Sequence, residues 1–310
     1  MRSFRITVLA STLCLFLFSP ASGWDGGGHM LVARIAHDRL DAAARQRVST
    51  IASRLNNNGT NYTFITLACW MDDIKDRNST SPYKGKFRTW HYINIGCSPS
   101  DPDVFADSAA LTATNGDIVR ALSHATSALR IGKFDEIIPD EAIALAVIVH
   151  LAGDIHQPMH TASRYDPNPT KGESPNDAGG NAVSIANLAD TPWKKNLHTF
   201  WDEAYRRYYD DGKARALPEL TADDGTGMHE WLDRLTPHTP TNLAFDAHRW
   251  ARETQSLGCT LAYGELREPY GAKNIVLKER YVTGAAAAAQ RQIVLAGWRL
   301  ASLLQGMYRK

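Results

Sequence analysis

The sequence predicts a mainly α-helical protein folded as a single helical domain, and three observations carry that prediction. Apolar residues recur at helical spacing over long segments, sustained two-residue alternation is scarce, and no internal repeat divides the chain. The 287 residues that follow an N-terminal leader are compatible with one hydrophobic core. We therefore expect residues 24–310 to form one domain of packed helices.

The first 23 residues have the pattern of a signal peptide. Residues 1–5 are short and basic, residues 6–18 are almost wholly apolar, and small residues precede a cleavage point after Gly23. The alternative is a membrane anchor, but about 13 apolar residues are too few to span a bilayer. We expect cleavage after Gly23 and a protein without an anchor, either secreted or retained in the lumen of the secretory pathway.

Four segments have the apolar spacing of helices. A helix start is clearest at Pro139, because Asp140 and Glu141 follow it and acids are favourable near the positive end of a helix. A loop is expected at residues 163–181, which are rich in Pro, Asn, Asp and Gly. This loop either borders a functional site or is a tolerated surface insertion. The predicted helices cover residues 29–40, 107–129, 139–156 and 285–304.

Composition limits the partners and the redox chemistry. Loss of Arg2 and Arg5 with the leader leaves 32 basic and 33 acidic side chains, a formal charge of −1. This balance argues against a tight, sequence-blind binder of duplex nucleic acid, which needs a basic face. The three remaining cysteines allow one disulfide and one thiol. Sequons at Asn58, Asn61 and Asn78 are expected glycan acceptors in a eukaryotic secretory pathway.

The segment from His150 to His160 contains the densest candidate chemistry. His150 and Asp154 are four residues apart, so on a helix they project from one face and suit one metal ion. On a straight helix His160 would lie about 15 Å further along. Pro158 tends to end or kink the helix, which would let the chain curl back and bring His160 to a neighbouring ion. This density of ligands favours a metal site over structural histidines.

Other candidate ligands are spread along the chain. His198 and Asp202 repeat the four-residue spacing, although such pairs also occur as surface contacts. Asp72 and His91 each lie among apolar or aromatic residues, where a buried polar group needs a partner and a cation is one such partner. For either residue taken alone, a structural role is slightly better supported than metal binding.

Cleavage after Gly23 would give Trp24 a free amino group beside its carbonyl oxygen, and together these can chelate one ion. The glycines at residues 26–28 are flexible enough for His29 to reach the same ion. The alternative is that Trp24 is only a remnant of cleavage, and spacing alone does not decide between the two.

Together these motifs resemble the zinc-dependent class I nucleases, the single-strand nucleases and 3′-nucleotidases of fungi and plants, which are related to bacterial zinc phospholipase C. The likeness covers nearly the whole chain after the leader. It rests on ordered pieces of sequence rather than on one motif. They are Trp24 with His29, Trp70-Met71-Asp72, Trp90-His91-Tyr92-Ile93-Asn94, residues 150–160, Gly179-Gly180-Asn181, residues 196–198 with Trp201-Asp202, and residues 250–259.

The resemblance implies a cleft with three zinc ions. One ion would take Asp72, His91, His150 and Asp154. A close neighbour would take the amino nitrogen and carbonyl oxygen of Trp24, His29 and the second oxygen of Asp154. A third would take His160, His198 and Asp202. These nitrogen and oxygen ligands are of the kind that zinc accepts. His156 is left out, and we expect it to have a supporting or structural role.

The resemblance also implies the substrates: single-stranded DNA and RNA cut to 5′-phosphate products, and 3′-mononucleotides. Asp154 would serve catalysis, and Lys75 stands where fungal members place an arginine near the phosphate. A lysine is a point charge rather than a fork, so we expect looser geometry. Tyr92 would stack on a base, and Asn94 and Asn181 would lie near it. Asn94 replaces an aspartate of the family, which leaves base preference open.

The resemblance pairs Cys97 with Cys259 and leaves Cys69 as a buried thiol. A monomer is expected. Two rival functions remain. The same ions could act on a lipid phosphodiester, as in phospholipase C, although Tyr92, Asn94 and Asn181 favour a base pocket. A secreted zinc-binding protein without catalysis is disfavoured, because a shared Asp154 would hold two ions close together.

Overall fold

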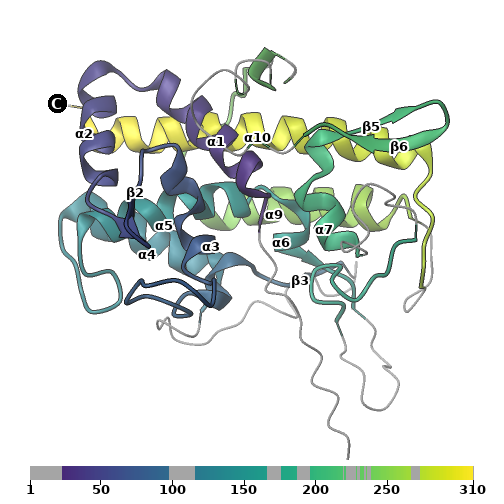
Figure 1. The fold of residues 1–310 in the computed structure, drawn as a ribbon, viewed down its shortest axis with the longest axis horizontal. Coiled ribbons are helices and arrows are strands. Elements are labelled where there is room, and N and C mark those ends of the chain that lie inside the picture. The colour runs from purple at the N-terminus through teal and green to yellow at the C-terminus, as the bar shows by residue number, and fades with distance from the viewer. Residues whose placement is uncertain are drawn as a thin grey trace, which may run out of the picture.

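The computed structural model describes residues 23–97, 116–165, 176–186, 196–218, 220, 228, 231–233, 235, 239–266 and 273–309. Helices dominate these residues (Figure 1), which confirms the predicted mainly α fold class. The longer helices are α1 (Gly26–Arg39), α2 (Ala42–Ala52), α4 (Ile118–Ile131), α5 (Glu141–Asp154), α9 (Ala247–Leu257) and α10 (Glu279–Tyr308).

Shorter helices and strand pairs connect the long helices. The short helices are η1 (Thr66–Cys69), α3 (Trp70–Asp73), η2 (Arg88–His91), α6 (Pro158–Thr161), α7 (Leu197–Asp202), η3 (Ala204–Arg206) and the π-helical η4 (Gly258–Tyr263). Antiparallel pairs join β1 (Asn56–Asn57) to β2 (Thr60–Asn61) and β5 (Arg207–Asp210) to β6 (Lys213–Ala216). One parallel pair joins β3 (Ile95–Gly96) to β4 (Ala162–Ser163).

The long helices pack in two layers. In Figure 1, α10 extends along the molecule with α1 against it, and α4, α5 and α9 lie beneath them in the view. Helix α4 packs on both α5 and α9, while α5 also contacts α1, α2 and α10. The hydrophobic core therefore surrounds α5, which is the helix that carries His150 and Asp154.

Helix α5 is buried on all sides. Asp140 caps it by accepting hydrogen bonds from the amides of Ala142 and Ile143, and every residue from Ala142 to Asp154 is buried. A helix that is apolar all round belongs in a core rather than at a surface. The helix ends at Asp154, two residues before the predicted end, and Pro158 then begins α6 as a first-turn proline. The chain therefore turns between the His150–Asp154 pair and His160, as Pro158 predicted.

Helix α1 begins earlier than predicted, and this corrects our interpretation of the glycines. Gly26, Gly27 and Gly28 form its first turn instead of a flexible arm, because Asp25 caps the helix by accepting from the amide of Gly28. The glycines permit close packing: a Cβ on Gly28 would lie 2.7 Å from the Cβ of Trp24, too close for any larger residue. His29 therefore reaches the core from a rigid helix.

Two other predicted helices differ at their ends. Helix α4 begins only at Ile118, because Gly116 has a φ of 111° and Asp117 caps the helix. An unbroken helix from residue 107 is therefore wrong at residues 116 and 117, and residues 107–115 lie outside the described ranges. Helix α10 extends beyond the predicted 285–304 at both ends. The predicted leader lies outside the described residues except for Gly23.

Within the described ranges, none of the helices is both long enough and apolar enough to cross a membrane.

Candidate metal centre

All eight predicted side-chain ligands lie close together in the interior. They form three groups whose candidate ligand atoms lie within 4.8 Å of one another. The ligands come from six elements, α1, α3, η2, α5, α6 and α7. The groups are His29 with His150 and Asp154; Asp72 with His91 and His150; and His160 with His198 and Asp202.

Asp154 lies at the centre of the cluster and is fully buried. Its Oδ2 lies 2.9 Å from Nδ1 of His91 and 3.0 Å from Nε2 of His150. Its Oδ1 faces another direction, 3.2 Å from Nε2 of His29 and 3.8 Å from Nδ1 of His160. Burial alone would raise the pKa of Asp154, but His150 and His160 hold it well below its usual value. A charged carboxylate with two differently directed oxygens can bridge two cations.

Asp72 and Lys75 close one side of this group. Asp72 Oδ1 lies 2.5 Å from the Lys75 ammonium and 3.7 Å from Nε2 of His150. Burial opposes ionisation of Asp72, yet Lys75 and His150 lower its pKa below the usual value. Burial and then Lys75 lower the pKa of His91 to about 3. The carboxylate is therefore charged and His91 neutral at pH 7, and these are the forms that bind metal.

The donor set fits zinc. The first reason is that several buried ligand atoms have no hydrogen-bond partner in the described part of the chain. Both ring nitrogens of His29 and Oδ1 of Asp154 are buried and form no hydrogen bond there. Such atoms are costly unless an ion completes them. The facing nitrogens of His91 and His150 are 3.0 Å apart, and those of His160 and His198 are 3.1 Å apart. Two nitrogens on one tetrahedral zinc ion are separated by about 3.3 Å.

Backbone carbonyls orient the histidines toward the cluster. Nδ1 of His150 bonds to the carbonyl of Ala68 at 2.6 Å, and Nδ1 of His198 bonds to the carbonyl of Gly179 at 2.8 Å. In both rings Nε2 then points to the neighbouring ligands. A carbonyl partner of this kind fixes the tautomer and the ring orientation of a metal-binding histidine.

Trp24, the first residue of the predicted mature chain, lies beside the cluster. The indole is fully buried and donates a 3.1 Å hydrogen bond from Nε1 to the carbonyl of Gly153. Residue 23 is closer still. A Cβ on Gly23 would lie 1.5 Å from Oδ1 of Asp154 and 2.9 Å from Nε2 of His29. The start of the predicted mature chain is therefore directly at the group that contains His29 and Asp154.

Asp25 is a supporting residue that the sequence analysis missed. Its carboxylate accepts from the amide of Gly28, from the hydroxyl of Tyr205 at 2.7 Å and from the guanidinium of Arg206 at 2.8 Å. Its own amide donates to the carbonyl of Asp202. Asp25 thus ties the N-terminal segment to the region of the third group. The sequence signal for this role was an aspartate directly before the first turn of a helix, the usual position of a capping residue.

Gln157 is a second missed residue, and it lies between α5 and α6. Its side-chain amide donates to Oδ1 of Asp202 at 2.6 Å, and its side-chain carbonyl accepts from the amide of Met159. Gln157 therefore caps α6 and orients Asp202 in one arrangement. A polar residue directly before Pro158 was the sequence signal for this cap.

His156 belongs to none of the three groups. Its Nδ1 bonds to the carbonyl of Ala152 at 2.7 Å, and its Nε2 lies 3.0 Å from the guanidinium of Arg299. Because the guanidinium can only donate, His156 is a neutral acceptor there. Burial and then Arg299 lower its pKa to about 3. This agrees with a structural rather than a ligand role.

The predicted base-contacting residues lie next to the metal-site residues. Tyr92 and Asn94 are partly buried and precede β3, and the amide of Ile93 between them donates to the carbonyl of His160 at 2.7 Å. Asn181 follows the turn that bonds to His198, and its own side-chain amide donates to the carbonyl of Ala178. The described end of the predicted loop thus borders the site.

The structure joins Cys97 to Cys259, with their Cα atoms 5.2 Å apart. The disulfide connects the segment after β3 to η4. Gln255, one turn before Cys259, adds a bond to the carbonyl of Gly96. Cys69 stays outside the disulfide, and it is half-buried where we expected a buried thiol; its Sγ donates to the carbonyl of Gly26 at 3.5 Å.

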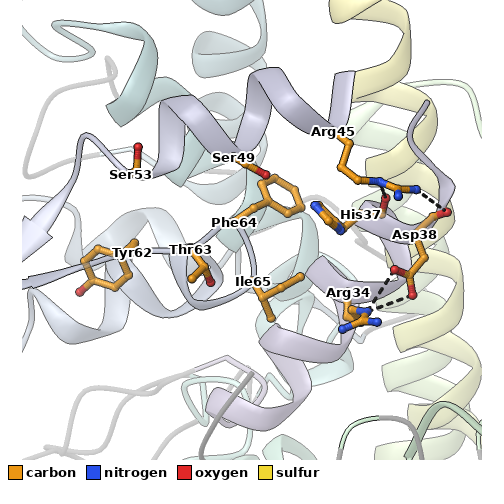
Figure 2. A pocket seen from close by; sticks show the side chains of 10 residues that line it. All are labelled: Arg34, His37, Asp38, Arg45, Ser49, Ser53, Tyr62, Thr63, Phe64 and Ile65. Atoms are coloured by element: carbon orange, nitrogen blue, oxygen red, sulfur yellow. Dashed lines mark hydrogen bonds and ion pairs between the residues drawn. The ribbon is translucent and has the colours of Figure 1, made fainter. Parts of the chain in front are cut away.

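A separate pocket of about 580 Å³ lies between α1, α2 and residues 62–65 (Figure 2). Arg45 at its rim donates to the carbonyls of His37, Asp38 and Leu40, and Arg34 pairs with Asp38. Its lining contains none of the predicted metal ligands. The metal cluster and this pocket are therefore distinct features.

Comparison with known proteins places this geometry in a family. A family model described as S1/P1 nuclease matches residues 24–309. Endonuclease 1 of Arabidopsis thaliana is 26% identical over 99% of this chain and 94% of its own length. Nuclease S1 of Aspergillus oryzae is 24% identical over 96% of each chain. Nuclease P1 of Penicillium citrinum is 22% identical over 92% of this chain and 98% of its own. The matched segment begins at Trp24 and contains every predicted ligand, and the chain therefore belongs to the S1/P1 nuclease family.

Proposed function

We propose that this protein is a secreted, zinc-dependent endonuclease that hydrolyses single-stranded DNA and RNA to 5′-phosphate products and removes the 3′ phosphate from mononucleotides. Membership of a zinc-dependent nuclease family supports phosphodiester hydrolysis. The observation that carries the proposal is Asp154, whose two oxygens face different histidines in a buried cluster. A carboxylate in this arrangement suits a pair of neighbouring cations acting on one phosphate.

The proposed ligand sets follow the three groups. Asp72, His91, His150 and Asp154 would hold one ion; the amino nitrogen and carbonyl oxygen of Trp24, His29 and Asp154 a second; and His160, His198 and Asp202 a third. When bound, the ions would supply a water of lowered pKa and positive charge for the phosphate oxygens. Cleavage after Gly23 is part of this proposal, because the Trp24 amino group exists only in the processed chain.

The chain's own side chains would position the substrate. The Lys75 ammonium lies at the edge of the cluster with 7% of its side chain exposed, where it can orient Asp72 and attract a phosphate. The ring of Tyr92 would stack on a nucleobase, while Asn94 and Asn181 would bond to the edge of the base. These proposed roles rest on one contact: the amide of Ile93, which lies between Tyr92 and Asn94, donates to the carbonyl of His160 at 2.7 Å. The segment that carries the candidate ligand His91 therefore also carries the two residues proposed to contact the base.

The decisive variant is Asp154→Asn. An amide cannot bridge two cations as a carboxylate does, so we expect zinc content to fall and cleavage of labelled single-stranded DNA to drop below about 1% of wild type. Loss of a ligand should exceed the 10- to 100-fold effect typical of changes to groups that only orient ligands. Zinc is measured by mass spectrometry, and product ends are mapped with and without a chelator.

Asp38→Asn is the matched control, because Asp38 is a surface acid of α1 whose carboxylate pairs with Arg34, away from the metal-ligand cluster. It should retain wild-type zinc and rate. Near-normal turnover by Asp154→Asn would contradict the proposal. Parallel assays on short-chain phosphatidylcholine test the substrate: preferential cleavage of the lipid would replace the nuclease assignment with a phospholipase.

A further inference from the structure

A buried carboxyl lies behind the third group, and none of the predicted roles uses it. Asp177 is 2% exposed. Its Oδ1 accepts from the hydroxyl of Ser163 at 3.0 Å, from the hydroxyl of Tyr263 at 2.9 Å, and from the amides of Arg164 and Gly180 at 3.0 and 3.2 Å. Its Oδ2 is buried and has no hydrogen-bond partner among the described residues. A buried acid satisfied on one oxygen only is costly to keep.

The carboxyl holds an unusual turn. Ala178, Gly179 and Gly180 all have positive φ, of 52°, 61° and 81°. Consecutive left-handed residues are rare in chains of L-amino acids, and the first of these is not glycine. The bond from the Gly180 amide to Oδ1 of Asp177 closes the turn, and the amide of Ala182 bonds to the carbonyl of Asp177. The amide of Gly179 also donates to the Ser163 hydroxyl at 3.4 Å, and that hydroxyl in turn donates to Oδ1 of Asp177, so the carboxyl supports the turn both directly and through Ser163. The amide of Ala178 donates to Oδ1 of Asn176 at 2.9 Å.

The turn delivers one carbonyl to the metal cluster. The carbonyl of Gly179 accepts from Nδ1 of His198 at 2.8 Å, so Nε2 of His198 faces Nε2 of His160. Gly179 is also pressed against α6, because a Cβ on it would lie 2.2 Å from the carbonyl oxygen of Met159. The next residue after the two glycines is Asn181, which we propose to contact the base.

We infer that Asp177 is a positioning residue for the third ion: it holds the 178–180 turn, whose carbonyl sets the tautomer and direction of His198. The inference rests on the proposed function, since it names what maintains one part of that site. The hydrogen bonds of the Asp177 carboxyl go to Ser163, Arg164, Gly180 and Tyr263, and none of these is a candidate ligand. The effect of Asp177 should therefore be selective for the ion held by His160, His198 and Asp202.

Two variants test the inference by zinc titration against a competing chelator. In Asp177→Ala the turn loses its acceptor, and we expect one of the three ions to bind about 10- to 100-fold more weakly while the other two keep wild-type affinity. Asp177→Asn should restore binding to within a few-fold of wild type, because its carbonyl can replace Oδ1. Equal weakening of all three ions, or no weakening at all, would overturn the inference.

A second measurement does not depend on zinc. In chelator-treated protein labelled with ¹⁵N, the Nδ1–H of His198 should be protected from exchange in wild type and Asp177→Asn, and should exchange rapidly in Asp177→Ala. Unchanged protection in Asp177→Ala overturns the inference even if the protein proves to have a different substrate. Conversely, a wild-type protein that shows no nuclease activity, or that binds fewer than three zinc ions, counts against the proposed function alone.

Asp135→Ala is the matched control, because Asp135 also accepts from two backbone amides, those of Ile137 and Ile138, but in an exposed turn. It should change neither readout. If Asp177→Ala does not fold, Ser163→Ala with Tyr263→Phe removes two of the four donors to the carboxyl, together with the Ser163 acceptor of the Gly179 amide, while leaving the carboxyl in place. That double variant should show the same selective weakening of one ion, and wild-type affinity for all three would again overturn the inference.

Discussion

At the scale of single residues, burial lowers the pKa of some interior histidines, whereas the equally buried His150 has a raised pKa because Asp154 and Asp72 outweigh its burial. His156 accepts from Arg299 and donates to Ala152, so a second proton would bring two donors face to face. His29 and His91 likewise have lowered pKa values because burial disfavours their charged forms. Each side chain with a lowered pKa is more easily protonated after unfolding than before it. Acid therefore acts on the stability of the metal-free protein through these residues.

The chelator-treated protein should lose stability as the pH falls from about 6.5 toward about 3. The pKa of His156 is about 3 in the folded protein and has its ordinary value of 6.5 in the unfolded chain, so its contribution to stability is complete above pH 6.5 and decreases below it. His156→Gln should flatten the dependence of the melting temperature on pH. His124→Gln, a partly exposed histidine bonded to Asp135, controls for the substitution itself. An unchanged slope in His156→Gln would contradict this explanation.

The residue scale also shows what sequence could and could not predict. The pairs His150–Asp154 and His198–Asp202 were predictable because helical geometry fixes a four-residue spacing. Asp72 and His91 could not be assigned from spacing, since their approach to Asp154 depends on packing between distant segments. Only the family resemblance selected them. Asp25, Gln157 and Asp177 each accept from a nearby amide, but the contacts that tie them to the site lie far along the chain. These distant partners are Arg206, Asp202 and Tyr263.

At the scale of elements, helix existence was easier to predict than helix ends. Helices α1, α5 and α10 follow from their apolar spacing, but the start of α1 depends on the Asp25 cap and on the close packing of Gly28 against Trp24. The start of α4 depends on Gly116. Such ends are set by single hydrogen bonds and backbone angles that periodicity does not record.

The disulfide should stabilise the elements beside the third group. The bond closes a loop with a sequence separation of 162. By restricting the unfolded chain, such a bond raises the free energy of the unfolded state by about 5 kcal/mol and so stabilises the folded state. The double variant Cys97→Ser/Cys259→Ser should therefore unfold at clearly lower urea concentration, by up to that free energy. Cys69→Ser is the control and should stay near wild type. Equal midpoints for the double variant and wild type would contradict the prediction.

At the scale of the whole molecule, the candidate metal centre is where distant segments of the chain meet. Its ligands come from six elements between Trp24 and Asp202, and α10 supports them from behind through α1 and α5. Binding of zinc to such a set stabilises the folded state as a whole, because the unfolded chain offers no preformed site.

A chain that retains residues before Trp24 should lose one zinc ion and most of its activity. The backbone of residue 23 lies against Asp154 and His29, so an added residue competes with the ion and removes the free amino group. The measurement compares zinc content and nuclease rate of a correctly processed chain, a chain with one extra N-terminal alanine, and a chain with the same extension at the C-terminus. Full zinc and full rate in the N-terminally extended chain would show that the Trp24 amino group is not a ligand.

The spread of the ligands also sets an order of events during synthesis. Among the candidate ligands, Trp24 and His29 leave the ribosome first, but the side chains that complete their surroundings extend to Asp202, and Cys259 emerges later still. Contacts between such distant segments close large loops and form slowly. The centre is therefore assembled late, after most of the chain is made, and a nascent fragment ending before residue 202 cannot hold the complete set. With the proposed function, hydrolytic capacity would arise as one of the last steps of folding.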